Sequence, residues 1–233
     1  MGPVYPTSTM LNSLPFGPAR LEWTLPTFER AAPAARSRAK LVLDAVLAAA
    51  LLLPLAPLLG LIALAIKLTS PGPVLFVQRR IGYHGTVFPM LKFRTMYDGA
   101  DRVEAQLAAR CRGRTFLKLE DDSRTTPLGR WLRLSSLDEL PQLYNVLRGD
   151  MSIVGPRPIL PCDLAKFPRG HQMRRFSAKP GITGLWQVSG RSLCTDEERI
   201  ELDLVYVDCW SLWLDFVILA RTVPVVLTGW GAC

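Results

Sequence analysis

The 233-residue chain lacks the residue patterns of most metal sites, disulfide scaffolds and nucleotide-binding loops. Its only histidines, His84 and His171, do not stand at a spacing typical of metal ligands. Its five cysteines are scattered and form no C-x-x-C pair, which argues against a zinc knuckle or a disulfide framework. Walker loops and the G-x-G-x-x-G pattern are also missing. The cysteine usage indicates a reducing, cytosol-facing compartment.

We expect neither a signal peptide nor an N-terminal myristoyl group. No basic region opens the chain, and Pro6 stands where a myristoylation pattern needs Ser or Thr. Residues 1–39 carry six prolines without an apolar period, so we expect a mobile N-terminal tail.

Positive charge and apolar residues, in contrast, are abundant. The formal net charge is +8, apolar residues make up 49% of the chain, and the mean hydropathy is +0.18. A basic balance suits nucleic acid, an anionic membrane surface or phosphate-rich substrates, while a generally basic soluble protein is the plain alternative.

Most of the apolar excess lies in one segment. Residues 45–66 carry no charge, and a bilayer needs about 20 such residues for a crossing. Pro54 and Pro57 in its middle predict a sharp bend. Cationic residues flank the segment on both sides: Arg36, Arg38 and Lys40 before it, and Lys67, Arg79, Arg80, Lys92 and Arg94 after it. Cationic flanks favour the cytoplasmic side. We therefore favour a re-entrant membrane helix over residues 40–69, broken at the prolines, above a kinked span; a buried helix of a soluble core fits least.

The remainder, residues 70–233, is expected to form a cytosolic catalytic domain of α+β class. Apolar runs on either side of Gly82–Gly85 predict a β-hairpin, and residues 98–112 look helical. Two helices are expected to divide near Ser135–Ser136, the second ending at Gly149. Leu140, Leu143 and Leu147 would form the buried stripe of that second helix.

The C-terminal apolar segment has two open interpretations. It contains Trp210, Trp213, Phe216 and Trp230 among aliphatic residues. Tryptophans gather at the headgroup level of membranes, which favours an interfacial helix. An ordinary amphipathic core helix explains the pattern equally well.

Asp138 and Glu139 are the strongest candidates for chemistry, although local structure also explains them. Ser136 followed by Glu139 matches a capping box, and acidic residues suit a helix N-terminus. A helix N-terminus would also keep Asp138 ionised, so capping and catalysis are compatible.

Cations elsewhere in the chain favour the catalytic interpretation. Arg133 lies on the same stretch, Arg157 sits in a rigid Gly-Pro-Arg-Pro turn, and Arg191 follows a glycine. Arginines on fixed backbones are suited to phosphates, and Mg²⁺ is usually held by one or two carboxylates plus substrate phosphates. Asp138 and Glu139 are therefore also the candidate metal ligands.

Several strings, in order, resemble the bacterial sugar transferase family, the small monotopic phosphoglycosyl transferases that begin exopolysaccharide assembly. They are KLVLDAVL, IKLTSPGPVLFVQRRIG, LKFRTM, DDSRTTPLGRWLR, SSLDELPQLYNVLRGDMSIVGPRP, KPGITGLWQVSGR and ELDLVYVDCWSLWLD. The resemblance covers the chain from about Lys40 onward. Pro57 matches the family's membrane bend, but Ala56 stands where the family usually has Ser, and Pro54 is additional. By its size the chain resembles the stand-alone form of the family.

The resemblance implies a specific reaction. Asp138 would be the nucleophile that becomes phosphoglycosylated, and Glu139 would bind metal or orient the acceptor. The set implied to hold phosphates comprises Arg133, Arg157 and Arg191, together with Lys92 and Arg94.

The implied donor is a UDP-sugar, the acceptor polyprenyl (undecaprenyl) phosphate, the cofactor Mg²⁺, and the location the cytoplasmic membrane, facing the cytoplasm among its lipids. A homodimer is left open. The membrane segment argues against nucleic acid as a partner. The rival interpretation is a non-catalytic, membrane-tethered component of a polysaccharide export complex.

Overall fold

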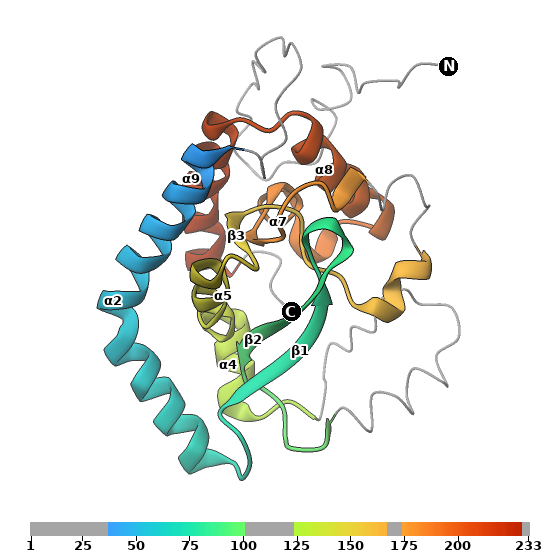
Figure 1. Cartoon of the computed structure of the whole chain (residues 1–233). Coiled ribbons are helices and arrows are strands. Elements are labelled where there is room, and N and C mark those ends of the chain that lie inside the picture. The colour runs from blue at the N-terminus through green and yellow to red at the C-terminus, as the bar shows by residue number, and fades with distance from the viewer. Residues whose placement is uncertain (1–36, 101–123, 167–173, 230–233) are drawn as a thin grey trace.

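A computed structural model of the chain describes residues 37–100, 124–166 and 174–229 (Figure 1). Helices dominate, and the strands form two small two-stranded sheets, so the expected mixture of helix and strand is confirmed. The elements in chain order are α2 (Arg38–Thr69), β1 (Leu75–Ile81), η2 (Tyr83–Gly85), β2 (Val87–Phe93), α4 (Pro127–Leu134), η3 (Leu137–Glu139), α5 (Gln142–Arg148), β3 (Ser152–Val154), η4 (Pro161–Lys166), β4 (Gly181–Thr183), α7 (Leu185–Ser189), η5 (Arg191–Leu193), α8 (Asp196–Asp208) and α9 (Leu212–Thr228).

Some predictions fall outside the described residues. They are the tail up to residue 36, most of the helix at residues 98–112, and Trp230. Ser37, within the range expected for the tail, caps α2 by accepting a hydrogen bond from the Lys40 amide at 3.3 Å.

Helix α2 runs without interruption through both prolines. Pro54 and Pro57 remove the amide hydrogens that would bond to the carbonyls of Ala50 and Leu53. Figure 1 shows the result as a curved helix whose two ends approach the rest of the molecule, so a bend takes the place of the expected break.

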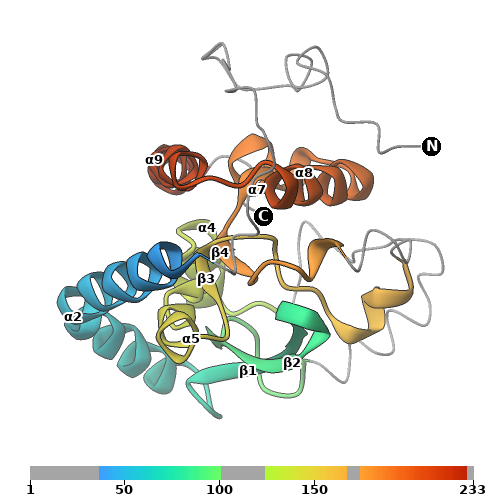
Figure 2. The same ribbon diagram turned by 45° about the horizontal axis from the view of Figure 1, so that its top comes forward.

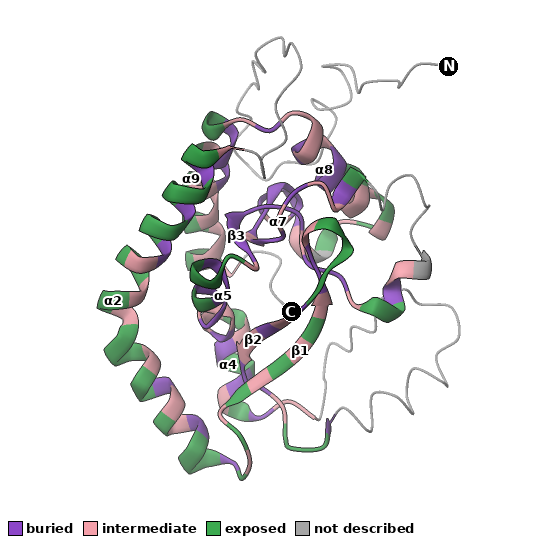
Figure 3. Ribbon diagram, in the orientation of Figure 1, coloured by how far each residue is buried: buried purple, intermediate pink, exposed green. Residues whose placement is uncertain are grey.

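The apolar surface of α2 is mostly exposed (Figure 3). By length and composition the helix could cross a membrane, and only 11% of its most apolar window is buried. A helix in the core of a soluble protein would be covered, so that alternative is wrong. Burial is confined to the two ends, with Ala48 near one and Ile62 and Ile66 near the other, while the proline-containing middle is exposed or only partly buried.

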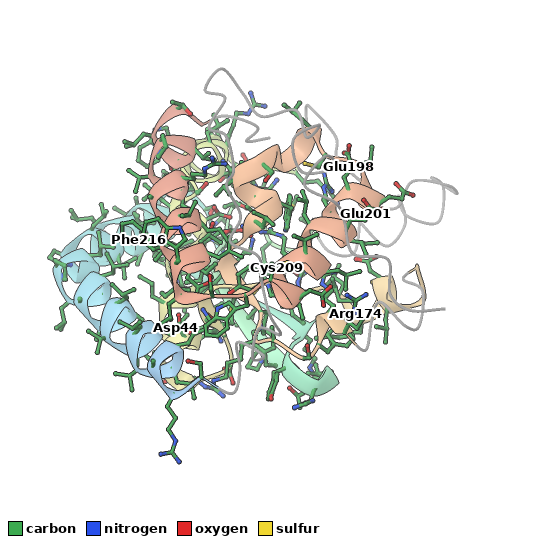
Figure 4. All side chains as sticks on the ribbon, turned by 90° about the horizontal axis from the view of Figure 1, so that it is seen from above. Asp44, Arg174, Glu198, Glu201, Cys209 and Phe216 are labelled. Carbon is green, nitrogen blue, oxygen red and sulfur yellow. The ribbon has the colours of Figure 1, made fainter. Side chains whose placement is uncertain are left out.

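The first turns of α2 are joined to the body by buried charges. Lys40 Nζ lies 2.7 Å from Asp215 Oδ2 of α9. Asp44 accepts hydrogen bonds from Ser152 Oγ at 2.7 Å and from the Ile153 amide at 3.1 Å, both in β3. Viewed from above, Asp44 lies where α2 meets the body (Figure 4). The sequence had assigned Lys40 only to a cationic flank.

The predicted hairpin is confirmed. Strands β1 and β2 are antiparallel, with Leu75 opposite Phe93 and Ile81 opposite Val87. Helix α5 is fastened to β2 through Asn145, which is fully buried. Its Oδ1 accepts from the Leu91 amide at 3.0 Å, and its Nδ2 donates to the Pro89 carbonyl at 2.8 Å.

Asn145→Ala is therefore expected to lower the free energy of unfolding by about 2–4 kcal/mol, because it removes a fully buried amide and leaves two partly buried backbone groups without partners. Chemical denaturation in detergent would measure the loss. The neighbouring Tyr144→Ala removes an exposed side chain and should cost about 0.5 kcal/mol or less. Equal losses in the two variants would contradict this role.

Two helices form here, as expected. The first, α4, ends at the cap residue Ser135, and the second, α5, ends at Gly149, which has the left-handed conformation with φ 84°. The predicted capping box is wrong, because Ser136 has φ 57° and its side chain caps no helix. A 3-10 turn, η3, takes the place of the first helical turn. The prediction of the buried stripe in the second helix is only partly correct, since Leu147 is exposed and the adjacent Val146 is buried.

The C-terminal half forms a second group of helices. Figure 2 shows α7, α8 and α9 on one side of the β3–β4 pair, with the hairpin on the other. The parallel β3–β4 pair needs glycine, because a Cβ on Gly155 or Gly181 would overlap the facing backbone. Helix α9 buries Leu214 and Ile218 and exposes Trp213 and Phe216, whose rings stack at 5.5 Å. It therefore has both a core face and an outer apolar face.

Candidate active site

The candidate carboxylates lie on η3, between α4 and α5. Asp138 is 8% exposed, and Glu139 is half-buried. The turn packs against β2, so it faces the strand that carries Lys92. This placement brings residues from two distant parts of the sequence together.

Glu139 is bound by two of the predicted cations. Lys92 Nζ lies 2.7 Å from Glu139 Oε1, and Arg157 Nη2 lies 3.2 Å from the same oxygen. Burial alone would raise the pKa of Glu139, but Lys92 and Arg157 outweigh it and hold that pKa well below its usual range. Glu139 is therefore a fixed negative charge.

Asp138 has the opposite shift. Burial raises its pKa above the ordinary range, and the negative charge of Glu139 adds to the rise. Lys92, Arg133 and Arg157 act against it. Two adjacent carboxyl groups with opposite shifts are typical of a site that performs chemistry.

Unusual backbone conformations also occur next to η3. Among the described residues, non-glycine positive φ values occur at His84, Ser136 and Arg191. Two of these residues touch each other, because Arg191 Nη2 donates to Ser136 Oγ at 3.0 Å. Such conformations cost of order 1–3 kcal/mol each and persist where the surrounding structure imposes them. Arg191 thus reaches the residue that precedes η3.

The remaining predicted cations divide into two cases. Arg133 lies beside the site, with its Nε 2.9 Å from Thr95 Oγ1, and its charge acts on Asp138. Arg94 is directed elsewhere, since its Nη2 donates to the carbonyl and the hydroxyl of Ser70, both at 2.8 Å. Arg94 therefore holds the end of α2. Phosphate binding by any of these residues stays a prediction.

Two residues near the site were not predicted from the sequence. Arg80 donates to the Pro158 carbonyl at 3.2 Å, next to Arg157. Trp186, in α7, is nearly buried and lies under the guanidinium of Arg157. Arg80 had been counted only as a flanking charge, and a single tryptophan in a loop-rich string gives no local signal of such a role.

The two carboxylates would be the protein ligands of the magnesium ion predicted from the sequence, with substrate phosphates as further ligands. Asp138 and Glu139 together offer two carboxylates, and no group of three potential metal-binding side chains occurs in the described part of the chain. A cation bound by protein alone usually has more ligands, whereas Mg²⁺ is often held by one or two carboxylates plus phosphates. Asp138 and Glu139 are thus the residues that would hold it.

The charge balance around Asp138 gives a testable pH dependence. If Asp138 must be ionised to react, kcat/KM falls as the pH drops through its raised pKa. Lys92 is the strongest cation holding that pKa down, so Lys92→Met should move the acid limb of the pH profile to higher pH. Arg148→Met, which alters an exposed ion pair with Asp150, should leave the limb in place. A shift to lower pH in Lys92→Met would contradict the assignment.

Comparisons with known proteins give a consistent result. A family model described as bacterial sugar transferase matches residues 35–229. The chain is 49% identical over 201 residues to the UDP-glucose:undecaprenyl-phosphate glucose-1-phosphate transferase of Caulobacter vibrioides, covering 81% of this chain and 70% of that protein. It is 42% identical over 194 residues to the exopolysaccharide production protein ExoY of Sinorhizobium fredii, covering 81% and 85%.

A longer protein is also similar. The galactosyl transferase CpsE of Streptococcus agalactiae is 48% identical over 164 residues, which cover 69% of this chain but 36% of that protein. The described carboxylates and cations, Lys92 to Arg191, all lie within the segment that the family model matches.

Proposed function

Because the chain belongs to the bacterial sugar transferase family, we propose that it is a phosphoglycosyl transferase that moves a sugar-1-phosphate from a UDP-sugar to polyprenyl phosphate and releases UMP. One observation supports this most directly. A buried aspartate, Asp138, lies among the charges of Lys92, Arg133 and Arg157, beside a glutamate that is held ionised.

The proposed reaction has two displacements at one phosphorus. Asp138 attacks the sugar-proximal phosphorus of the donor, a new carboxyl–phosphorus bond forms, and the bridging P–O bond breaks with its electron pair leaving on UMP. An oxygen of the polyprenyl phosphate then attacks the same phosphorus. The bond to Asp138 breaks, and the aspartate regains its negative charge. No redox partner is needed.

The cations of the site would offset the charge of these anions. Lys92 and Arg157 already neutralise Glu139, and Arg133 lies close enough to act on Asp138. Fixed donors in a site shielded from water stabilise developing charge more than the same groups do in water. A magnesium ion held by Asp138 and Glu139 would supply further charge stabilisation at the donor phosphates.

We also propose a place for the site at the membrane. Both ends of α2 contact the same body, near Lys40 and near Ile66, while Pro54 and Pro57 are exposed in a middle section that is only partly buried. This arrangement favours a helix that enters and leaves the cytoplasmic leaflet on one side, so the catalytic body would stand at headgroup level. Trp213 and Phe216 on the outer face of α9 would lie at the same level. Cysteine labelling on the two flanks tests this, and opposite sidedness would refute it.

The proposed donors are UDP-hexoses. The Caulobacter relative is named for glucose and the Streptococcus relative for galactose. Purified protein should release UMP over many turnovers from one of these UDP-sugars only when polyprenyl phosphate and Mg²⁺ are both present, and at most about one UMP per active site when the acceptor is left out. Release of UDP would indicate a different glycosyltransferase reaction, and no nucleotide release from any UDP-sugar would favour the non-catalytic alternative.

A further inference from the structure

The backbone that carries Arg157 is held from two sides. Its carbonyl accepts a hydrogen bond from Arg175, whose guanidinium lies 2.6 Å from Asp203 Oδ2 in α8, and both of these side chains are buried. On the other side, Arg80 of β1 donates to the Pro158 carbonyl at 3.2 Å. These contacts fix the position of the Arg157 backbone but not the orientation of its guanidinium group.

The face of Trp186 supports that guanidinium. The central carbon of the Arg157 guanidinium lies 5.7 Å from the ring centroid, and that of Arg199 lies 5.2 Å from the same ring. Guanidinium groups within about 6 Å of an indole are attracted to its face, more strongly where water is excluded. Trp186 is 9% exposed, so one nearly buried ring attracts two cations.

Arg157 and Arg199 both connect the Trp186 ring to η3, the first directly and the second through Arg191. Arg157 ends on Glu139 Oε1 at 3.2 Å. Arg199 donates to the Arg191 carbonyl at 3.4 Å, and the Arg191 side chain reaches Ser136 Oγ, the residue directly before η3. The Trp186 ring is thus connected through Arg157 to Glu139, and through Arg199 and Arg191 to Ser136, which precedes the turn that carries Asp138. The ring itself contacts neither carboxylate.

We propose that Trp186 is a positioning residue for the transfer reaction, acting through Arg157 and, in second place, through Arg199. This inference rests on the proposed function. Without the aromatic face, the Arg157 guanidinium has more orientations available and spends less time on Glu139. The cationic charge around the reacting phosphates then becomes less ordered, and turnover per active site falls.

The first test compares Trp186→Leu with Trp186→Phe. Both are apolar and smaller than Trp, but only Phe keeps an aromatic face. We expect kcat/KM per active site to fall about tenfold with Leu and about threefold with Phe, in line with the strength of cation–π contacts that are only partly exposed to water. Active sites are counted by the stoichiometry of label retained from a labelled donor. Equal losses with Leu and Phe, or no loss with either, would overturn the proposal.

A double-variant cycle separates positioning from general destabilisation. If Trp186 acts through Arg157, Trp186→Leu should cost less than about threefold in a protein that already carries Arg157→Gln, because interacting residues are not additive. A full tenfold further loss in that background would mean that Trp186 does not act through Arg157 and would overturn the proposal.

A third measurement does not depend on turnover. Phenylglyoxal modification, followed by peptide mass spectrometry, should label Arg157 several-fold faster in Trp186→Leu than in the wild type, since stacking and ion pairing both protect a guanidinium. Arg148, exposed at the end of α5, serves as the internal reference. An unchanged Arg157 rate would refute the positioning role. If the wild type transfers no sugar phosphate, the proposed function fails, yet this rate still decides the role of Trp186.

Discussion

Asp138→Asn should reduce transfer of sugar phosphate by at least about a thousandfold, because an amide is a poor nucleophile and cannot form the proposed acyl-phosphate. The substitution keeps nearly the same shape at a residue that is 8% exposed. It also removes a charge whose burial is costly, so the fold should be unharmed. The large loss would therefore be chemical in origin.

Two measurements check this expectation. Transfer is followed by UMP release, and the covalent intermediate by label that stays on the protein after acid quenching of a reaction with labelled donor alone. Asp138→Asn should retain none. Glu201→Gln removes one negative charge from the outer edge of α8 (Figure 4) and should behave as the wild type. Near-normal turnover of a folded Asp138→Asn protein would show that another group is the nucleophile.

Asp215→Asn, in α9, should be the most destabilising single substitution among the residues that join the start of α2 to the body. The Asp215 carboxylate accepts hydrogen bonds from Lys40 at 2.7 Å, from Tyr206 at 2.8 Å and from Trp210 at 3.0 Å. Removing its charge leaves Lys40 buried, with Asp44 3.7 Å away as the remaining counter-charge. Breaking a buried pair typically costs about 3–5 kcal/mol, and the second carboxylate reduces the expected loss to about 2–4 kcal/mol.

Chemical denaturation in detergent would measure this loss. The double variant Lys40→Met with Asp215→Asn removes the uncompensated charge and should recover at least about 1 kcal/mol relative to Asp215→Asn alone. A single variant as stable as the wild type would show that the pair does not join α2 to α9. So would a double variant whose loss is the sum of the two single losses.

Local patterns in the sequence predicted the elements that depend on local physics. The hairpin of β1 and β2, the left-handed end of α5 at Gly149 and the apolar length of α2 all follow from residues next to one another. The capping box predicted at Ser136 was wrong because the prediction used only local residues. Its spacing to Glu139 matches a capping box, but contact with Arg191, more than 50 residues away, accompanies a left-handed conformation instead.

The candidate site could be predicted only in part. Lys92 and Arg157 do meet Glu139, while Arg94, two residues after Lys92, is directed to Ser70. Charge and spacing alone do not distinguish these two cations. Residues two apart in a strand share a face, but β2 ends at Phe93, so Arg94 lies beyond the strand and its direction does not follow from the alternation. The role inferred for Trp186 needs three segments to come together, which no window of sequence contains. The pair of Lys40 and Asp44, four residues apart at the edge of an apolar run, is a local signal for buried charges at the start of α2.

The attachment of α2 at both ends has a consequence for the lipid around it. A free transmembrane segment adjusts to a thicker or thinner bilayer by tilting. Helix α2 is held by the Lys40–Asp215 pair at one end and by Ile66 and Arg94 with Ser70 at the other. Once seated in a leaflet as proposed, it has no such freedom, so hydrophobic mismatch would have to be absorbed by deformation of the lipids. The insertion depth would then be encoded in the protein, and bilayers of different acyl-chain length would alter the reach of the acceptor phosphate rather than the angle of the helix.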